Sequence, residues 1–296
     1  MKNFERYGWP ALACLLFSTA HADGTGRHSL MLSVQGDEND NQQWLSKLVL
    51  PLGDYAWIQG SIGRTELATA PTISTRTVGA AMGVGNQRVQ AAVAFTRRTS
   101  DTQFEQQDWA GALDWHGARG GLGADVFLRS TNGESQTTTR PGGVFSPPVT
   151  TTVRESVDSK GFGLHGDFDL TPRTKVFAGA MRYRHDFHFA STTTGTHTPL
   201  SSLLGSPAAL SGVWRDQAFI DSSYRVGTSY RFQGAAVSAQ YFRDRIVNPD
   251  ETLGTVQLQA EFLIGERWLV SPTIGYSSGN RTEPTAYGGL SIGFTW

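Results

Sequence analysis

Alternation of apolar and polar residues is the feature of this sequence that most limits its fold. Successive side chains of a β-strand point to opposite faces of a sheet, so a period of two predicts strands. The alternating segments lie at about 28–37, 42–50, 54–66, 74–85, 88–99, 104–117, 120–131, 155–170, 173–190, 215–231, 234–246, 252–264, 267–278 and 285–296. Because none has a convincing helical period, we predict an all-β fold of about fourteen strands.

The connections between these segments alternate in length. Tight turns lie at 51–54, 85–87, 116–119, 170–173, 233–234 and 265–267. The other connections are mostly longer and polar, above all 132–154 and 191–214. Short turns at one end and long loops at the other are typical of membrane barrels, whose turns are periplasmic and whose loops are extracellular. We therefore predict a single transmembrane antiparallel up-and-down β-barrel.

One face of the predicted strands is apolar over the length that a tilted strand needs to cross lipid. Leu122 and Val126 lie on this face, and the same alternation assigns Phe177, Met181 and Tyr183 to it. Aromatic residues gather near the segment ends, as in the girdles at the two membrane interfaces. We expect this face to contact lipid.

The opposite face is small and polar, with charges of both signs. We expect it to line a wet lumen through Asp114, His116, Asp125, Arg129, His165, Asp167, Arg182, Arg184, Asp186, Asp221, Arg225, Gln257, Gln259 and Glu261. These charges either face each other across water and tune ion passage, or form pairs that satisfy each other in a narrow barrel. A soluble sandwich is disfavoured because such a surface would usually carry more Lys and Glu.

The first 22 residues have the order of a secretory signal peptide. Lys2 and Arg6 precede a short apolar run at 11–17, and a small-x-small site at 20–22 follows it. We expect cleavage there and a mature barrel of residues 23–296. The only cysteine, Cys14, lies inside this segment. A lipid anchor on Cys14 is the less favoured alternative, because most of the apolar run would follow the modified residue.

The last strand, AYGGLSIGFTW at 286–296, ends on an aromatic residue. It resembles the C-terminal strand of Gram-negative outer-membrane β-barrel proteins, which typically ends in Phe or Trp after alternating apolar residues. The resemblance implies that Phe294 and Trp296 are recognised by the barrel-assembly machinery. It also implies an integral outer-membrane protein in contact with lipid and lipopolysaccharide, with both termini in the periplasm. It assigns no substrate.

The segment MRYRHDFHF at 181–189 is the densest polar cluster. Its predicted register sends Arg182, Arg184, Asp186 and His188 inward and His185 outward. The cluster is a substrate-binding patch, a metal site completed by His197, or a rim where Arg and His meet lipopolysaccharide phosphates. Because His185 and His188 lie on opposite faces, we expect no metal, and no other cofactor is indicated.

Enzymatic motifs do not match well. The segment RSTNGES at 129–135 resembles the outer-membrane phospholipase motif only faintly, because it lacks the histidine two residues before the serine. His116 is about a strand length away from Ser130. Outer-membrane aspartyl-type proteases place acids and a His-Asp pair at the rim, where Asp101, Asp216, Asp244, His185 and Asp186 are candidates, but that family has ten strands. We therefore predict that the protein is not an enzyme.

We expect a porin-like channel for passive passage of small polar solutes or ions. The near balance of 25 basic and 26 acidic residues argues against a nucleic-acid partner. The mixed signs of the inward-facing charges do not predict strong ion selectivity. The main alternative is a closed barrel that serves as a membrane component or scaffold for a partner. A membrane-embedded hydrolase is a third possibility, and it requires a Ser-His or Asp-His pair within hydrogen-bond reach at the rim. The long loops either constrict the lumen, bind a partner or stay mobile.

Overall fold

The computed structural model describes residues 28–68, 73–101, 104–139, 149–191, 219–247, 251–280 and 283–296. These ranges contain strands β1 (Ser29–Asp37), β2 (Gln42–Pro51), β3 (Ala56–Leu67), β4 (Ile73–Gly85), β5 (Val89–Ser100), β6 (Phe104–His116), β7 (Gly120–Thr139), β8 (Val149–Asp169), β9 (Thr174–Ser191), β10 (Ile220–Arg231), β11 (Ala235–Ile246), β12 (Glu251–Ile264), β13 (Trp268–Gly279) and β14 (Thr285–Thr295). Within the same ranges, no helix is long and apolar enough to cross a membrane.

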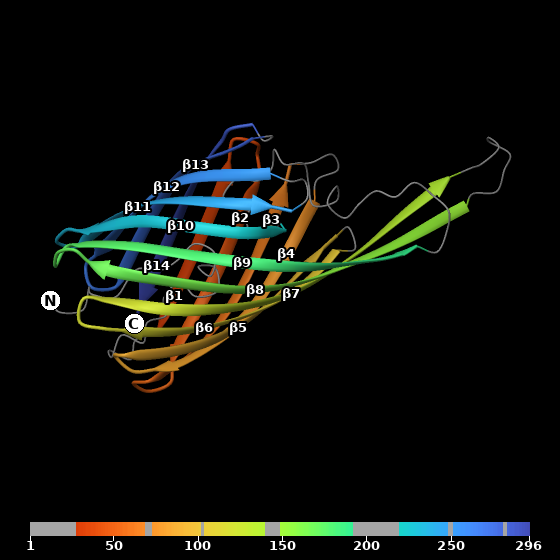
Figure 1. Cartoon of the computed structure of the whole chain (residues 1–296). Helices are drawn as coiled ribbons and strands as arrows, with labels where there is room; N and C mark the ends of the chain where they lie inside the picture. The colour runs from red at the N-terminus through yellow and green to blue at the C-terminus, as the bar shows by residue number, and fades with distance from the viewer. Residues whose placement is uncertain are drawn as a thin grey trace.

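The strands form one closed antiparallel barrel in sequence order (Figure 1). Closure is made by β1 and β14, in a register that pairs Ser29 with Thr295. Beyond these strands, the backbones of His28 and Trp296 exchange two hydrogen bonds of 3.1 Å. The predicted fourteen-strand up-and-down barrel is confirmed, and each strand pairs with both of its neighbours.

The tight turns and both described ends of the chain lie at one end of the barrel, which we call the turn end (Figure 1). Three of these turns have a left-handed backbone that glycine adopts without strain, at Gly53 with φ 74°, Gly234 with φ 80° and Gly265 with φ 66°. The opposite end, where the longer connections leave, is called the loop end. The alternation of short and long connections is therefore as predicted.

Strands β7 and β8 continue far beyond the loop end as a ribbon (Figure 1). Pairing between β6 and β7 stops at Phe104 and Gly133, whereas β7 and β8 stay paired out to Thr139 and Val149. The predicted loop at 132–154 is wrong in this respect, because its Thr- and Val-rich flanks favour strand. Most of the predicted loop at 191–214 lies outside the described residues, and the strand predicted from 215 begins at Ile220.

The wall has two faces of opposite character. Large apolar side chains such as Leu122, Val126 and Phe162 are more than half exposed on the outer face. On the inner face, Ala81, Ala94 and Ala110 are buried side by side. The buried side chains of this protein therefore line the inside of a wall, and every inner residue is a candidate for contact with whatever enters the lumen.

Candidate functional site on the inner wall

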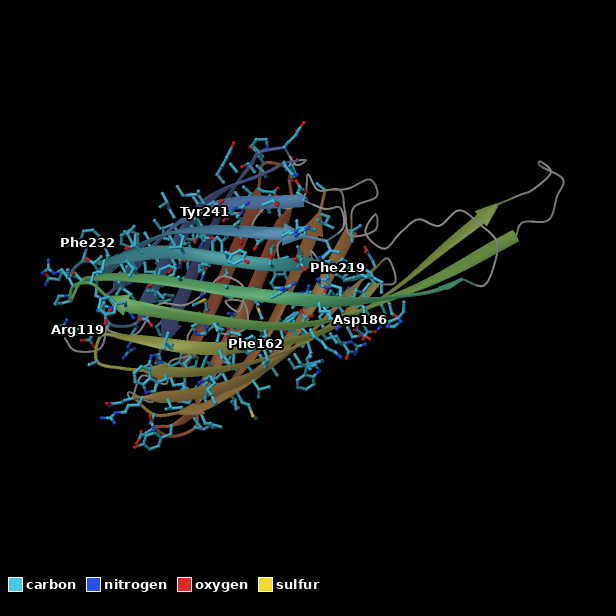
Figure 2. The ribbon with its side chains drawn as sticks, viewed as in Figure 1. Arg119, Phe162, Asp186, Phe219, Phe232 and Tyr241 are labelled. Carbon is cyan, nitrogen blue, oxygen red and sulfur yellow. The ribbon has the colours of Figure 1, made fainter. Side chains whose placement is uncertain are left out.

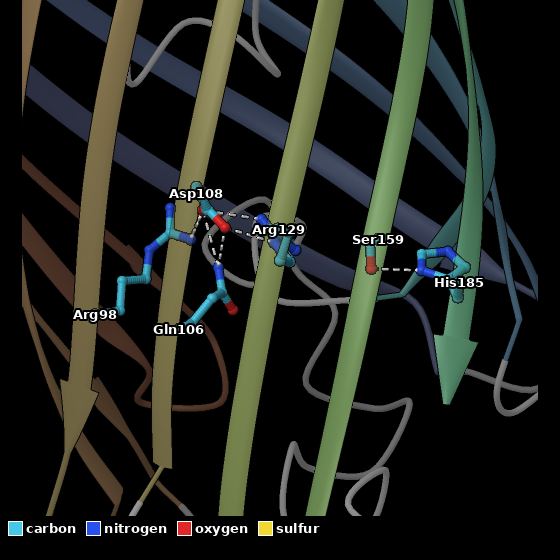
Figure 3. Close-up of polar contacts among 6 residues, drawn as sticks. All are labelled: Arg98, Gln106, Asp108, Arg129, Ser159 and His185. Atoms are coloured by element: carbon cyan, nitrogen blue, oxygen red, sulfur yellow. Dashed lines mark hydrogen bonds and ion pairs between the residues drawn. The ribbon is translucent and has the colours of Figure 1, made fainter. Parts of the chain in front are cut away.

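The strand register places inner-face residues of neighbouring strands in rows around the wall. One row runs through Asp108 of β6, Arg129 of β7, Ser159 of β8 and His185 of β9, which pair in that order. Arg98 of β5 lies one step nearer the loop end, opposite Gln106. Directly paired residues have Cβ atoms about 4.5–5.5 Å apart, so these side chains can interact. Figure 3 shows this polar row.

Asp108 is the centre of the polar row. Its carboxylate accepts hydrogen bonds from Arg98 Nη1 at 2.7 Å, from Arg129 Nε at 2.8 Å and from Gln106 Nε2 at 2.9 Å. The Asp108 side chain is only 2% exposed, and those of Arg98 and Arg129 are 8% and 11% exposed. Two guanidinium groups therefore surround one carboxylate, and together these three side chains carry a charge of +1.

Ser159 and His185 form a hydrogen-bonded pair at the end of the polar row. Ser159 Oγ lies 2.7 Å from His185 Nδ1, and His185 Nε2 lies 2.9 Å from the carbonyl oxygen of Ile220. A carbonyl can only accept, so Nε2 is the donor of the ring. In a neutral ring Nδ1 then accepts from the serine hydroxyl. The pair thus has the proton arrangement of a serine and its general base.

Aromatic rings continue from the polar row along the inner wall. Tyr183 meets Phe127 edge to face at a centroid distance of 5.7 Å and stacks on His185 at 6.4 Å. Phe219 meets His185 edge to face at 5.7 Å. The guanidinium of Arg129 lies 4.9 Å from the centre of the Phe127 ring. This part of the wall offers aromatic faces beside a positive charge.

A second charged cluster lies nearer the turn end. His165 of β8 binds Asp125 Oδ2 through Nδ1 at 2.8 Å and Asp114 Oδ1 through Nε2 at 2.7 Å. Asp114 is two strands away, and Gly123 of β7 lies between them. A Cβ at Gly123 would overlap both the His165 ring and the Asp114 carboxylate. Since carboxylates only accept, a ring that donates to both carries two protons and a positive charge.

Several other inner-face residues also have contacts on the wall. Lys175 Nζ lies 2.7 Å from Asp167 Oδ2, and the guanidinium of Arg225 lies 6.0 Å from the centre of the Phe177 ring. His116 and Asp167 flank Gly121, whose missing side chain gives both of them room. On the far wall, Tyr287 donates to Gln257 at 3.0 Å and Gln259 donates to Glu261 at 3.2 Å.

No family model and no curated protein matches the chain. Among solved structures, it resembles the CymD monoaromatic hydrocarbon channel with a TM-score of 0.60 and 10% identity, over 97% of this chain and 92% of that chain. The chain has the fold of an outer-membrane β-barrel channel. More distant matches are OmpT of Vibrio cholerae, with a TM-score of 0.48, 10% identity and coverage of 91% and 97%, and a KdgM porin, with 0.43, 6%, 90% and 99%.

In this outer-membrane-type barrel, the predicted orientation of β9 is wrong. Arg182 pairs with the exposed Phe162, and Arg184 pairs with Lys160, so both arginines and Asp186 lie on the outer face. Phe177, Met181 and Tyr183 lie on the inner face instead. The physical reason is space, because a Cβ at Gly161 would overlap the Tyr183 ring.

His185 and His188 do lie on opposite faces of β9, as expected, but with the sides exchanged: His185 is inside. Asp221 lies at a bulge between Ile220 and Ser222, at the loop end of β10. His197 is outside the described residues. The structure therefore does not bring Arg182, Arg184, Asp186 and Asp221 together with the inner-wall clusters.

Four residues of this site, Arg98, Gln106, Asp108 and Ser159, were not among those predicted from the sequence to line the lumen. The signal was present, because Asp108 alternates with Trp109 and so belongs on the face opposite that tryptophan.

Near the end of the barrel, Phe294 packs on Trp268 at 4.7 Å and on Trp296 at 5.9 Å. These rings form an aromatic group at the turn end.

Proposed function

We propose that the protein is an integral outer-membrane channel for passive passage of small polar solutes or ions. The observation that supports this most is a closed barrel with an apolar outer face and an inner wall that carries ionised clusters. The leader at 1–22 is removed on export, and Phe294 and Trp296 serve as the assembly signal. Charges of both signs on the inner wall support weak ion preference.

Single-channel conductance of the refolded mature protein in a planar bilayer tests this proposal. Folding is first verified by heat-dependent gel mobility. Stable ohmic steps with a small reversal potential in a salt gradient are expected, and polymers of increasing size should block them at a defined cutoff. Silence from a folded barrel rejects the channel and favours the closed scaffold, whose partner would then be sought by crosslinking.

Small aromatic solutes are a refinement of the same proposal. The solved structure that matches with a TM-score of 0.60 is named as a monoaromatic hydrocarbon channel. In this protein, Phe127, Tyr183 and Phe219 present rings on the inner wall. Uptake into liposomes of paired aromatic and aliphatic solutes of equal charge and size tests it. Faster aromatic uptake that falls with Tyr183→Ala supports the refinement, and equal uptake rejects it.

A second candidate function is ester hydrolysis by Ser159 and His185, because their 2.7 Å contact meets the distance that a serine hydrolase needs. Ser159 Oγ would attack an ester carbonyl carbon while its proton moves to His185 Nδ1 and then to the departing alcohol. Water would release the acyl group by the reverse path. Against this, Ser159 is only 2% exposed, and a carbonyl rather than a carboxylate holds Nε2. Fluorophosphonate labelling that Ser159→Ala abolishes would support hydrolysis, and no labelling of the folded wild type rejects it.

A further inference from the structure

A basic patch lies on the outer face of β8, β9 and β11, where the apolar outer face ends. It consists of Lys160, Arg182, Arg184 and Arg243, all of which are exposed. Lys160 lies directly opposite Arg184, and Arg182 pairs with Ser222 of β10. Arg245 pairs with Ser222 from the other side and extends the patch. Strand register thus gathers five basic residues from three strands.

The boundary between apolar and basic residues lies at neighbouring register positions on these strands and moves towards the turn end from β8 to β11, since Phe162 pairs with Arg182 and Tyr224 pairs with Arg243. Phe162, Ala180, Tyr224 and Tyr241 are the last apolar outer residues on β8, β9, β10 and β11, and basic residues follow on three of them. A tilted strand crosses the hydrocarbon in about 9–11 residues, and a count from Thr174 of β9 reaches the interface at Arg182. Figure 2 shows Asp186 beyond Phe162, where β8 and β9 leave the barrel. The patch therefore lies at the headgroup level of the outer leaflet, where an arginine costs little.

Charge in the patch is only partly balanced by neighbouring acids. Arg184 Nε lies 3.7 Å from Asp186, with the Arg184 side chain 84% exposed, and Asp158 pairs with Asp186 nearer the loop end. Two cations directly opposite each other, as Lys160 and Arg184 are, destabilise a sheet unless an anion lies between them. By contrast, outer-face Arg64 and Arg97 of β3 and β5 each have a glutamate partner at 2.7 and 2.9 Å.

We propose that this patch binds the phosphate groups of a phosphorylated outer-leaflet lipid, such as the lipid A part of lipopolysaccharide. The acyl chains lie on Phe162, Tyr224 and Tyr241, and the phosphates accept hydrogen bonds from the arginines above them. Continuity of the patch with the lipid-facing surface favours a lipid over a free anion. The proposal rests on the outer-membrane location proposed above, but not on an open lumen.

Native mass spectrometry of the full mature protein in detergent, titrated with diphosphorylated lipid A, tests the proposal. The variant Lys160→Gln/Arg182→Gln/Arg184→Gln/Arg243→Gln is expected to weaken binding at least tenfold, since each basic residue contributes about fivefold to attraction by an anionic surface. The control Arg88→Gln/Arg119→Gln/Arg173→Gln/Arg267→Gln removes four exposed arginines at the turn end and should bind like wild type. Both variants must show the heat-dependent gel mobility of a folded barrel; Arg182→Gln/Arg184→Gln is used if the fourfold variant fails.

Two further arms identify the ligand. Lipid A without phosphates should bind wild type as weakly as the diphosphorylated lipid binds the patch variant. Inorganic phosphate at equal phosphate concentration should not displace the lipid. Unchanged binding by the patch variant, equal binding of the dephosphorylated lipid, or full displacement by inorganic phosphate would each overturn the proposal. Binding is measured on the folded protein without recording conductance. A folded barrel that shows no conductance would therefore reject the proposed channel without changing the outcome of this test.

Discussion

Asp108→Asn should be among the most destabilising conservative substitutions in the barrel. The wild-type carboxylate holds two guanidinium groups at 2.7 and 2.8 Å, and all three side chains are nearly excluded from water. The neutral amide removes the negative charge but leaves Arg98 and Arg129 buried side by side. Breaking a buried pair by removing one partner costs about 3–5 kcal/mol. We therefore expect the free energy of unfolding to fall by that amount.

Glu105→Gln is the matched control, three residues away on the same strand. Glu105 pairs with Arg97 at 2.9 Å on the outer face, where their side chains are 35% and 54% exposed. Exposed pairs contribute at most about 1 kcal/mol. Equilibrium urea unfolding of the barrel in lipid vesicles, followed by tryptophan fluorescence, measures both variants. Equal costs for the two variants would refute the reasoning, because they would show that the inner wall is solvated like the outer surface.

The double variant Asp108→Asn/Arg98→Gln tests whether uncompensated positive charge accounts for the cost. If two uncompensated cations cause most of the cost, removing one of them should restore part of the stability. In a double-mutant cycle, the double variant should then lose less stability than the sum of the two single variants. A purely additive result would show that the two side chains are not coupled in the folded barrel and would contradict this reasoning.

Three other predictions concern the wall and the ribbon. Gly123→Ala should lower the unfolding free energy by about 1–3 kcal/mol, because its Cβ would overlap His165 and Asp114. Gly60→Ala is the control and should leave the unfolding free energy unchanged, because its Cβ would meet nothing within 4 Å. Equal costs for the two variants would contradict this prediction. Arg225→Gln should shift the reversal potential towards cation preference and Arg182→Gln should leave it unchanged, since only Arg225 lies inside; equal shifts would place both in the lumen. Replacing 136–152 by a short turn should preserve heat-dependent gel mobility, because the described residues of this segment, 136–139 and 149–152, pair with each other and not with β6 or β9. Loss of the folded band would contradict this.

Strand number and closure followed from the sequence because period two and turn residues are local signals. The orientation of β9 did not, because both of its faces carry large or charged residues near the loop end. Met181 and Tyr183 look lipid-facing by hydropathy, but the Gly161 and Gly163 positions of β8 leave them room inside. That room depends on the pairing of two strands, which composition along one strand cannot show. The arginines at 182 and 184 then lie outside, at the level where lipid headgroups begin.

Pairs of inner residues were also beyond the sequence argument. Asp114, Asp125 and His165 were predicted to lie on the inner face, but their contacts depend on the register of three strands, and the contact between Asp114 and His165 crosses an intervening strand. The Ser159–His185 pair was missed for a similar reason, since its register became visible only once β8 and β9 were aligned. Sequence alternation therefore assigns faces, whereas chemistry on the wall depends on neighbours.

The reach of His165 over Gly123 has a consequence for how the barrel is built. A slip of β8 by one residue would turn His165, Asp167 and Asp169 towards lipid while exposing Phe162 and Leu164 to water. It would also separate the imidazole from carboxylates on two different strands at once. The contacts of one side chain, His165, therefore depend on the correct alignment of three consecutive strands. A misaligned wall would lose both contacts of this imidazole together, so the native register of β6, β7 and β8 is favoured over its neighbours.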